Sequence, residues 1–254
     1  MVKVAAISYL NTLPFIYGLK NHSVSKQIDL SVCTPSAGAD MIISGEVDLG
    51  IIPVAAVPFI PNYKIISDYC IGATGKVASV LLCSNVPVNK ITKLYLDTDS
   101  RSSVMLSRIL CRHYWKISPL FENFNFYNLD YNLEDSYIII GDKALEHGYK
   151  FKYVYDLAQE WINFKGKPFV FACWIANKEL DVNFINEFNS ALKYGIDNID
   201  NAIEECAAKL KFTKQFAHNY LLNNISYNLD KNKKEGLQDF WTLALEELKS
   251  KVRW

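Results

Sequence analysis

Polar side chains recur in this sequence wherever an apolar stretch gives way to an expected helix. The segments are "SYLNT" at residues 8–12, "TPSAG" at 34–38, "SRSS" at 100–103 and "GD" at 141–142. Each places hydroxyls, amides or free backbone N–H groups at a helix start, where a carboxylate or phosphate is stabilised. One such segment alone is typical of an ordinary N-cap, but four together favour a site for an anionic ligand.

Motifs for other chemistries are missing from the sequence. The four histidines, at positions 22, 113, 147 and 218, show no metal-binding spacing such as H-E-x-x-H. Neither a G-x-S-x-G elbow, a Walker loop nor a G-x-G-x-x-G fingerprint occurs. The six cysteines form no C-x-x-C pair and mostly lie in apolar runs, which favours buried free thiols over disulfides. We therefore expect a site without metal or cofactor.

The first third of the chain alternates strand and helix signals. We expect strands over 2–7, 28–33 and 47–53, with helices over 13–20 and from Pro35 to Gly45. Thr34 is the expected N-cap of the second helix, Pro35 its first residue and Gly45 its terminator. Strands and helices that alternate with short connections indicate parallel βαβ units.

A second α/β unit follows one long apolar strand expected over 76–84. It contains expected strands at 93–97 and 137–141, a helix at 101–115 with Ser100 as its N-cap, and a short helix at 141–148. Residues 153–166 are expected to form a strand that enters a helix ending at Gly166. A second long strand at 168–177 then leads into a region read as helical from Val182 to the end. We predict an α/β protein with one lobe from 1–84 and 177–254, a second lobe from 85–176, and two crossover strands. In such folds ligands bind beyond the carboxyl ends of the strands.

The overall composition indicates which class of binding partner to expect. The 254 residues carry 27 basic and 27 acidic side chains, so no global field favours nucleic acid or an anionic membrane. We predict a small-molecule ligand, and the high aromatic content suggests that one or two aromatic residues line a wall against a planar ring. The apolar run after Lys3 is interrupted at Asn11 and Pro14, so we expect a retained N-terminus and a cytoplasmic protein.

Several blocks of the sequence, in one order, resemble a known enzyme family. They are the opening "VAAISYLNTLPFIYGL", "PSAGADMIISGEVDLGIIPVA", "GKVASVLLCS", "DTDSRSSVMLSRILC", "IIIGDKAL" and "DLAQEWINFKGKPFVFACW". Together they cover residues 4 to about 176 and resemble chorismate dehydratase of the futalosine route to menaquinone. The resemblance implies a fold like that of type II periplasmic binding proteins.

The resemblance also implies the reaction and its residues. Chorismate would lose its C4 hydroxyl and C3 proton as water, giving 3-[(1-carboxyvinyl)oxy]benzoate. Asn11 would hold the C4 hydroxyl or a carboxylate, and Ser79 would donate to the leaving hydroxyl. The proton acceptor stays open between the enolpyruvyl carboxylate of the substrate and Asp142. The predicted substrate-binding residues are Tyr9, Ser36, Pro53, Ser100, Ser102, Ser103, Gly141 and Phe169.

Two alternatives remain beside this lyase. One is a ligand carrier of the same bilobal fold, without catalysis. The other is the sister enzyme that makes 1,4-dihydroxy-6-naphthoate, which carries a histidine base where this chain has Gly141. Neither a nucleic acid nor a membrane is an expected partner, and the chain is expected to act as a monomer or a homodimer.

Overall fold

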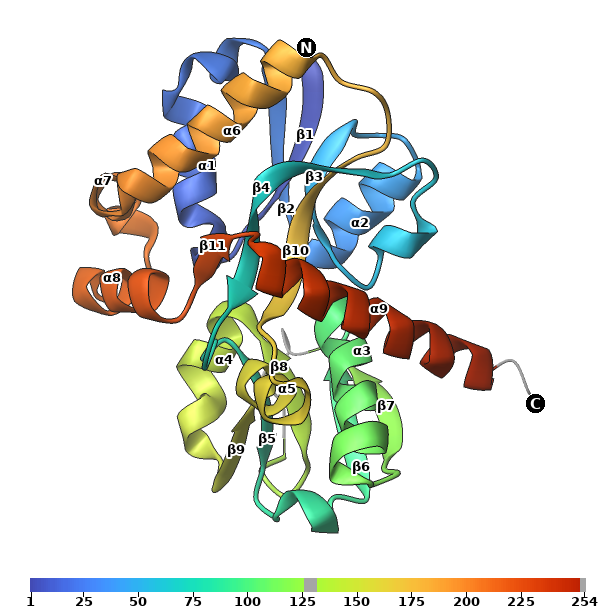
Figure 1. Cartoon of the computed structure of the whole chain (residues 1–254). Helices are drawn as coiled ribbons and strands as arrows, with labels where there is room; N and C mark the ends of the chain where they lie inside the picture. The colour runs from blue at the N-terminus through green and yellow to red at the C-terminus, as the bar shows by residue number, and fades with distance from the viewer. Residues whose placement is uncertain (126–131, 252–254) are drawn as a thin grey trace. The chain divides into compact units, whose positions relative to one another are not determined.

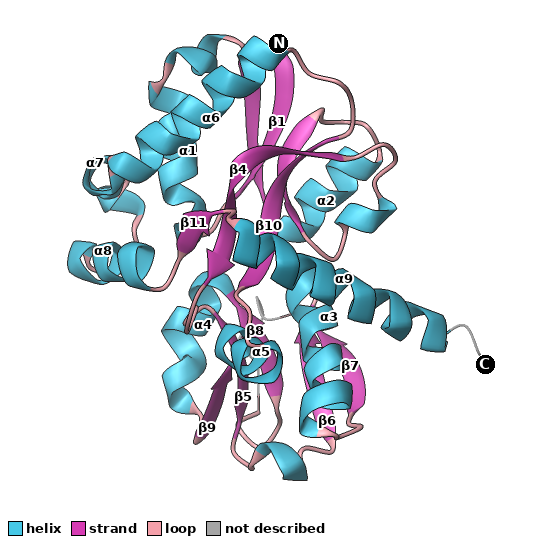
Figure 2. Ribbon diagram, in the orientation of Figure 1, coloured by secondary structure: helices cyan, strands magenta, loops and turns pink. Residues whose placement is uncertain are grey.

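The computed structural model describes residues 1–125 and 132–251 of the chain. It divides into two compact units (Figure 1), the first formed by Met1–Gly72 with Phe171–Asp230 and the second by Ala73–Val170 with Lys231–Trp254. Each unit is built around its own sheet with helices packed against it (Figure 2). The predicted α/β class is thus confirmed.

The first unit contains a six-stranded sheet in the order β11-β4-β10-β3-β1-β2. Its strands are β1 (Val2–Ile7), β2 (Ile28–Cys33), β3 (Leu49–Pro53), β4 (Lys64–Ala73), β10 (Phe169–Ala176) and β11 (Ser226–Asn228). β1 pairs in parallel with both β2 and β3, as the βαβ pattern predicts, whereas β10 runs antiparallel to β3. The carboxyl ends of β1, β2 and β3 therefore meet at one edge of the sheet.

Close helix packing supports this sheet. The helices of the unit are α1 (Leu13–Asn21), α2 (Pro35–Ile43), α6 (Val182–Asp197), α7 (Ile199–Glu205) and α8 (Lys214–Asn223). α1 and α6 touch at Gly18 and Gly195, where a Cβ on Gly18 would lie 2.0 Å from the carbonyl oxygen of Ala191. Trp174 of β10 packs edge-on against Phe15 of α1 and Phe188 of α6. The small residues let the helix backbones approach, and the aromatic rings fill the core behind them.

The second unit contains a five-stranded sheet in the order β7-β6-β8-β5-β9. Its strands are β5 (Val80–Ser84), β6 (Lys93–Asp97), β7 (Leu120–Phe124), β8 (Tyr137–Ile140) and β9 (Tyr153–Asp156). β6 pairs in parallel with β7 and β8, and β5 runs antiparallel to β8 and β9. Because Val80 pairs with Ile140 and Leu81 with Asp156, the start of β5 lies at the same edge as the ends of β8 and β9.

Among the residues that the structure describes, the α-helices of the second unit are α3 (Arg101–Ile109), α4 (Gly141–His147), α5 (Leu157–Lys165) and α9 (Lys231–Lys251). The expected helix over 101–115 is α-helical only to Ile109 and continues as a π-helix through Trp115. Phe240 of α9 is fully buried against Phe169, with ring centroids 5.2 Å apart, and also contacts Trp161 of α5. The C-terminal helix is therefore part of the core of this unit.

Helix ends follow the predicted local signals. Thr34 caps α2, since its hydroxyl accepts the N–H of Ala37 at 3.4 Å, and Pro35 begins the helix. Gly45 and Gly166 have φ of +77° and +68°, a left-handed conformation that glycine adopts without a steric penalty. These short-range features are encoded within a few residues, and the structure has them where the sequence places them.

Some elements differ from the prediction. The long strand in the middle of the chain is β4, at Lys64–Ala73, while residues 76–79 lie outside a strand and β5 begins only at Val80. Buried and exposed residues do not alternate cleanly along β4, because its first half is largely exposed and its second half is buried. The two-residue hydrophobic period that predicts a strand is therefore weak there. β7 was not predicted, and β11 interrupts the region read as helical throughout.

The unit boundaries also differ from the predicted lobes. The observed boundaries fall within β4 and β10, and the second unit includes β5 and α9, which the sequence placed in the first lobe. Nothing local in the sequence of an amphipathic helix states which sheet it covers. That choice is made by the side chains it buries, here those around Phe240.

Most of the cysteines are buried in the two units. All six cysteines are free, and burial raises the pKa of the Cys83 and Cys111 thiols to about 12.

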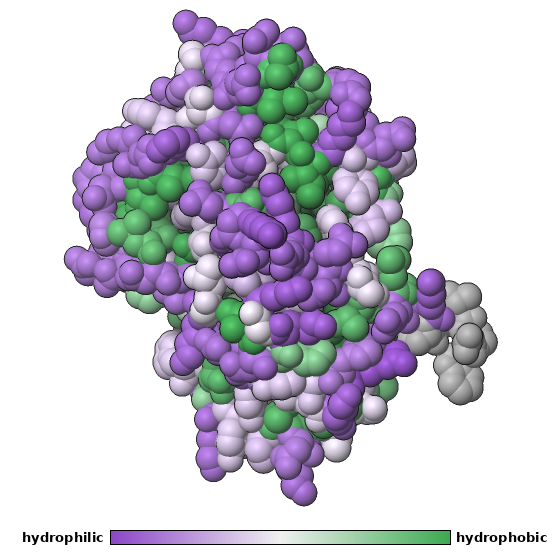
Figure 3. Space-filling model, viewed as in Figure 1, coloured by the Kyte–Doolittle hydropathy of each residue, from purple (hydrophilic) through white to green (hydrophobic). Residues whose placement is uncertain are grey.

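On the face shown in Figure 3, hydrophilic residues cover most of the surface and hydrophobic residues gather in separate patches. None of the helices in the described ranges combines the length and hydropathy needed to cross a bilayer.

Candidate functional site

The first set of predicted residues lies at the carboxyl edge of the sheet of the first unit. Tyr9 and Asn11 follow β1, Ser36 lies in the first turn of α2 after β2, and Pro53 is the last residue of β3. Because these three strands are parallel neighbours, four residues from three separate segments of the sequence share one edge. The sheet topology thus brings together the first-unit part of the predicted set.

Asn11 lies in a short 3-10 helix, Leu10–Thr12, which joins β1 to α1 and is hydrogen-bonded by neighbouring hydroxyls. Thr12 is fully buried, and its hydroxyl donates to the carbonyl oxygens of Ile7 and Tyr9, the latter at 2.8 Å. The buried Tyr227 hydroxyl of β11 donates to the backbone carbonyl of Asn11 at 3.0 Å. Burial raises the pKa of Tyr227 well above its ordinary value, so this hydroxyl keeps its proton. Two hydroxyls therefore hold the backbone on either side of the Asn11 side chain.

The Asn11 side chain presents an unused acceptor. Its amide oxygen Oδ1 is buried and accepts no hydrogen bond from any residue in the described ranges. A buried polar atom without a partner costs about 1–3 kcal/mol, so native proteins retain few of them away from functional positions. An amide oxygen in this state fits a ligand that offers a hydroxyl or N–H donor.

The second set of predicted residues lies at one edge of the sheet of the second unit. Ser79 immediately precedes β5, Gly141 and Asp142 begin α4 after β8, and the serines of "SRSS" begin α3 after β6. The N–H of Gly141 donates to the carbonyl of Ser79 at 2.8 Å, which joins the start of β5 to the end of β8. Most of the second-unit residues are therefore neighbours of this edge.

Two serines at the start of α3 are hydrogen-bonded to each other. Ser100 is the N-cap, and its hydroxyl accepts the N–H of Ser103 at 3.2 Å and donates to the Ser103 hydroxyl at 2.7 Å. Ser102 and Ser103 are 2% and 1% exposed. The capping role that a single polar segment suggested is thus present here, and the carboxylate-binding role of Ser102 and Ser103 stays a prediction.

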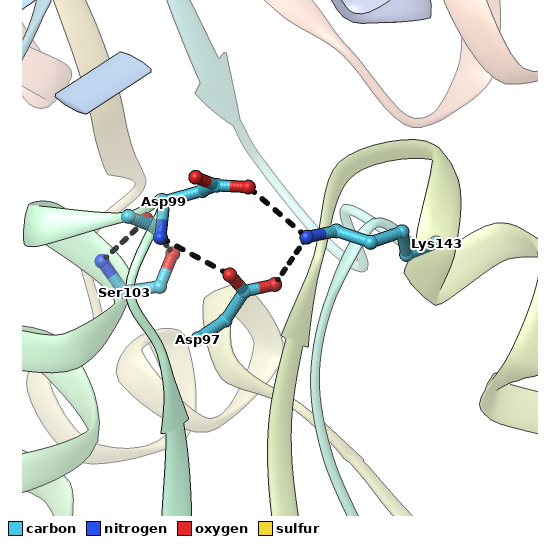
Figure 4. A network of polar contacts seen from close by, with 5 residues as sticks. Asp97, Asp99, Ser103 and Lys143 are labelled. Carbon is cyan, nitrogen blue, oxygen red and sulfur yellow. Dashed lines mark hydrogen bonds and ion pairs between the residues drawn. The ribbon is translucent and has the colours of Figure 1, made fainter. Parts of the chain in front are cut away.

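An ion cluster that sequence reasoning missed lies beside these serines (Figure 4). The ammonium of Lys143 lies 2.9 Å from Asp97 Oδ2 and 3.1 Å from Asp99 Oδ2, while the N–H of Asp99 donates to Asp97 Oδ1. The Asp97 side chain is 1% exposed, and burial raises its pKa even though Lys143 opposes the shift. The sequence shows that Asp97 ends an expected strand and that Lys143 lies in the first turn of an expected helix. It does not show that these two residues form an ion pair.

The backbone before Ser79 is unusual. Ala78 has φ of +63°, in the left-handed region that non-glycine residues rarely occupy, and Gly141 has φ of +60°. The buried Asp156 carboxylate accepts the N–H groups of Val77 and Ala78, and also caps α5. Burial raises the pKa of Asp156, although its backbone hydrogen bonds act in the other direction. Asp156 was not among the predicted residues.

Phe169 begins β10, but its side chain packs in the core of the second unit. It is 1% exposed and packs against Trp161 and Phe240 with ring centroids 5.4 and 5.2 Å away. An apolar strand residue gives the same sequence signal whether it packs in a core or faces a ligand, so the sequence did not separate the two roles. Within the described part of the chain, no group of three or more His, Cys, Asp or Glu side chains has the arrangement of a metal site.

Comparison with known proteins identifies the family. The sequence profile of a protein family described as menaquinone biosynthesis matches residues 2–246. This chain belongs to that menaquinone biosynthesis family. The match extends through the C-terminal helices, beyond the blocks that carried the resemblance in the sequence.

Solved structures show the fold of this menaquinone biosynthesis protein. It is similar to protein AF1704 from Archaeoglobus fulgidus, with a TM-score of 0.75, 14% identity and 97% of each chain covered. It is also similar to the periplasmic aliphatic sulphonate binding protein SsuA from Escherichia coli, with a TM-score of 0.64, 13% identity, and 99% of this chain and 92% of that chain covered.

A third similar structure is a Candida albicans protein described as having the generic periplasmic binding protein fold. Its TM-score is 0.58 at 14% identity, with 98% of this chain and 95% of that chain covered. At such identities the likeness establishes the fold alone. The periplasmic-binding-protein-like fold that the sequence resemblance implied is confirmed.

Proposed function

We propose that this protein is a chorismate dehydratase that converts chorismate into 3-[(1-carboxyvinyl)oxy]benzoate and water. Membership of a menaquinone biosynthesis family supports the pathway. The observation that carries the specific activity is the buried, unpaired amide oxygen of Asn11 in a short 3-10 helix hydrogen-bonded by Thr12 and Tyr227. Such an acceptor suits the C4 hydroxyl of chorismate, which is a donor.

For this elimination the protein must mainly position the substrate and supply oriented hydrogen bonds. A base takes the C3 proton, the C4–O bond breaks, and the departing hydroxide takes up a proton, so that water is lost overall. The ring becomes aromatic, and no electrons are gained or lost overall. Aromatisation makes the elimination favourable, and oriented hydrogen bonds lower its barrier. Such a step needs no redox cofactor, in keeping with the predicted cofactor-free site.

The residues take separate roles in this reaction. Asn11 holds the C4 hydroxyl, and Ser79 donates a hydrogen bond to that oxygen as it departs. Ser102 and Ser103 bind a substrate carboxylate through their hydroxyls at the start of α3. Lys143 is already neutralised by Asp97 and Asp99, so we do not assign it to a carboxylate. The C3 proton goes to the enolpyruvyl carboxylate of the substrate or to Asp142.

The dihydroxynaphthoate synthase reading receives less support. The family resemblance places the histidine base of that sister enzyme at the position of Gly141. Here Gly141 has φ of +60°, a conformation that disfavours any side chain at this position. A glycine at a left-handed position cannot supply a base, so the site fits dehydration better than the synthase reaction.

The test is to incubate pure protein with chorismate, without added cofactor, and to follow the benzoate product by chromatography. Asn11→Ala should lower kcat/KM by about a hundredfold, the size of effect expected for one lost hydrogen bond to the reacting oxygen. Asn21→Ala, which removes an exposed amide at the end of α1, is the matched control and should keep full activity.

The outcomes separate the alternatives. Full activity in Asn11→Ala would reduce the segment to a capping role. No product above the spontaneous background, with chorismate bound unchanged in a binding assay, would favour the ligand carrier over the lyase. In the same assay, near-normal turnover by Asp142→Asn would leave the substrate carboxylate as the proton acceptor.

A further inference from the structure

Ser79 follows one residue with a left-handed backbone conformation and is hydrogen-bonded to another. Ala78, directly before it, has φ of +63°, and the Ser79 carbonyl accepts the N–H of Gly141, whose φ is +60°. A left-handed conformation is sterically unfavourable for a non-glycine residue, so it persists only where other contacts impose it. Ala78 therefore needs a contact that imposes this conformation.

The contact is a carboxylate from another element. Asp156 ends β9 and is 9% exposed. Its Oδ2 accepts the N–H of Ala78 at 2.7 Å, and its Oδ1 accepts the N–H of Val77 at 3.2 Å. Oδ1 also accepts the N–H groups of Ala158 and Gln159 at 3.1 and 3.2 Å, which caps α5. One carboxylate therefore ties the segment before Ser79 to the first turn of a helix.

Only a carboxylate meets this set of donors with both of its oxygens. An amide at the same position would keep one oxygen for the α5 cap, because Asn and Asp cap helices about equally well. Its NH₂ group would then face the N–H of Ala78, donor against donor. Replacing Asp156 by Asn thus removes the tether on Ala78 while leaving the helix cap in place.

We propose that Asp156 is a positioning residue for the dehydration: it holds Ala78 in the left-handed conformation and thereby aims the Ser79 hydroxyl at the departing C4 oxygen. This inference rests on the proposed function through the role of Ser79. It adds a residue that touches no substrate atom and acts only through the backbone.

The experiment compares kcat for chorismate in Asp156→Asn, Ser79→Ala and the double variant. Asp156→Asn should lower kcat by about tenfold to a hundredfold with a smaller change in KM, since small misplacements of a reacting group have effects of this size. In the Ser79→Ala background the same change should have almost no further effect, because the two residues act as one unit. Equal losses in both backgrounds would overturn the inference.

Two further variants keep the test decisive if Asp156→Asn folds poorly. Ala78→Val penalises the left-handed conformation without touching the carboxylate and should lower kcat similarly. Ala78→Gly, added to Asp156→Asn, should restore part of kcat, because glycine adopts positive φ without steric cost. Asp181→Asn, which changes the N-cap of α6 in the first unit, is the control and should leave kcat unchanged.

A crystal structure of Asp156→Asn separates this inference from the proposed function. Loss of the positive φ at Ala78 is expected, whether or not the wild-type protein turns over chorismate. A wild-type protein without dehydratase activity, together with a changed Ala78, would reject the proposed function and keep Asp156 as the residue that holds this segment. An unchanged positive φ at Ala78 would overturn the inference itself.

Discussion

Two buried polar groups stand out at the residue scale, and their environments differ. The Asn11 amide oxygen has no partner within the described residues, whereas the Asp97 carboxylate lies against Lys143. The first is an unused acceptor in a short 3-10 helix, Leu10–Thr12, and the second is a carboxylate paired with an ammonium group. Both lie next to strand ends, and the Asn11 oxygen is the one that we propose as an acceptor for the ligand.

The Asp97–Lys143 pair gives a prediction about pH. Lys143→Met leaves a buried carboxylate without its cation and should lower the free energy of unfolding by about 3 kcal/mol at pH 7. Burial already raises the pKa of Asp97, and loss of Lys143 raises it further. Between the unfolded pKa, about 3.9, and that raised value the folded state binds more protons, so stability falls as pH rises.

Urea denaturation at pH 7 and near pH 4 checks this sign. The destabilisation caused by Lys143→Met should be largest at pH 7 and should shrink as Asp97 becomes protonated. Lys193→Met breaks an exposed pair with Asp197 and should change stability by no more than about 0.5 kcal/mol at either pH. A penalty for Lys143→Met that grows toward pH 4 would contradict the assignment of a buried ionised carboxylate.

Close packing of α1 against α6 is the main feature at the element scale. Gly18 and Gly195 let the two backbones approach, and a Cβ on Gly195 would lie 1.8 Å from the carbonyl oxygen of Pro14. These contacts are to backbone atoms, which cannot rotate aside as a long side chain can. α1 follows directly from the 3-10 helix of Asn11, so this packing also fixes the helix that continues from that segment.

Gly18→Ala should therefore lower the free energy of unfolding by at least about 2 kcal/mol. Alanine favours a helix over glycine by about 1 kcal/mol, but overpacking against backbone atoms outweighs this gain. Gly75→Ala is the control, because a Cβ there meets nothing within 4 Å. Urea denaturation of both variants measures the difference, and equal stabilities would show that α1 and α6 can separate at little cost.

At the scale of the whole molecule, the decisive finding is that α9 belongs to the second unit. Phe240 is buried against Phe169 and Trp161, Lys167 lies 2.9 Å from Asp239, and Gly236 approaches the Pro168 carbonyl closely. The chain thus returns to the second unit after it has completed the first. The stability of that unit should depend on its last helix.

Phe240→Ala should lower the free energy of unfolding by about 3–5 kcal/mol, the range for deleting a buried phenylalanine side chain. Leu245→Ala, on an exposed position of the same helix, should stay within about 0.5 kcal/mol of the wild type. Hydrogen exchange then locates the effect: protection should fall in β5, β8 and β9. A loss confined to β1, β2 and β3 would support the predicted lobe boundaries instead.

The sequence by itself determined the α/β class, the parallel strands β1 to β3, the caps at Thr34 and Ser100, and the terminators Gly45 and Gly166. Each of these depends on residues a few positions apart, through periodicity, capping chemistry or the conformational freedom of glycine. The strand-end segments were equally visible, because a polar residue after an apolar run is a local feature.

Only the tertiary structure decided which of those segments share an edge, and what lies beside them. The Asp156–Ala78 bond joins residues 78 positions apart, and Lys143–Asp99 joins residues 44 apart. Phe169 entered the core, and α9 joined the second unit. Such choices depend on which side chains fill a common volume and which charges meet there, and no local pattern of residues encodes that partnership.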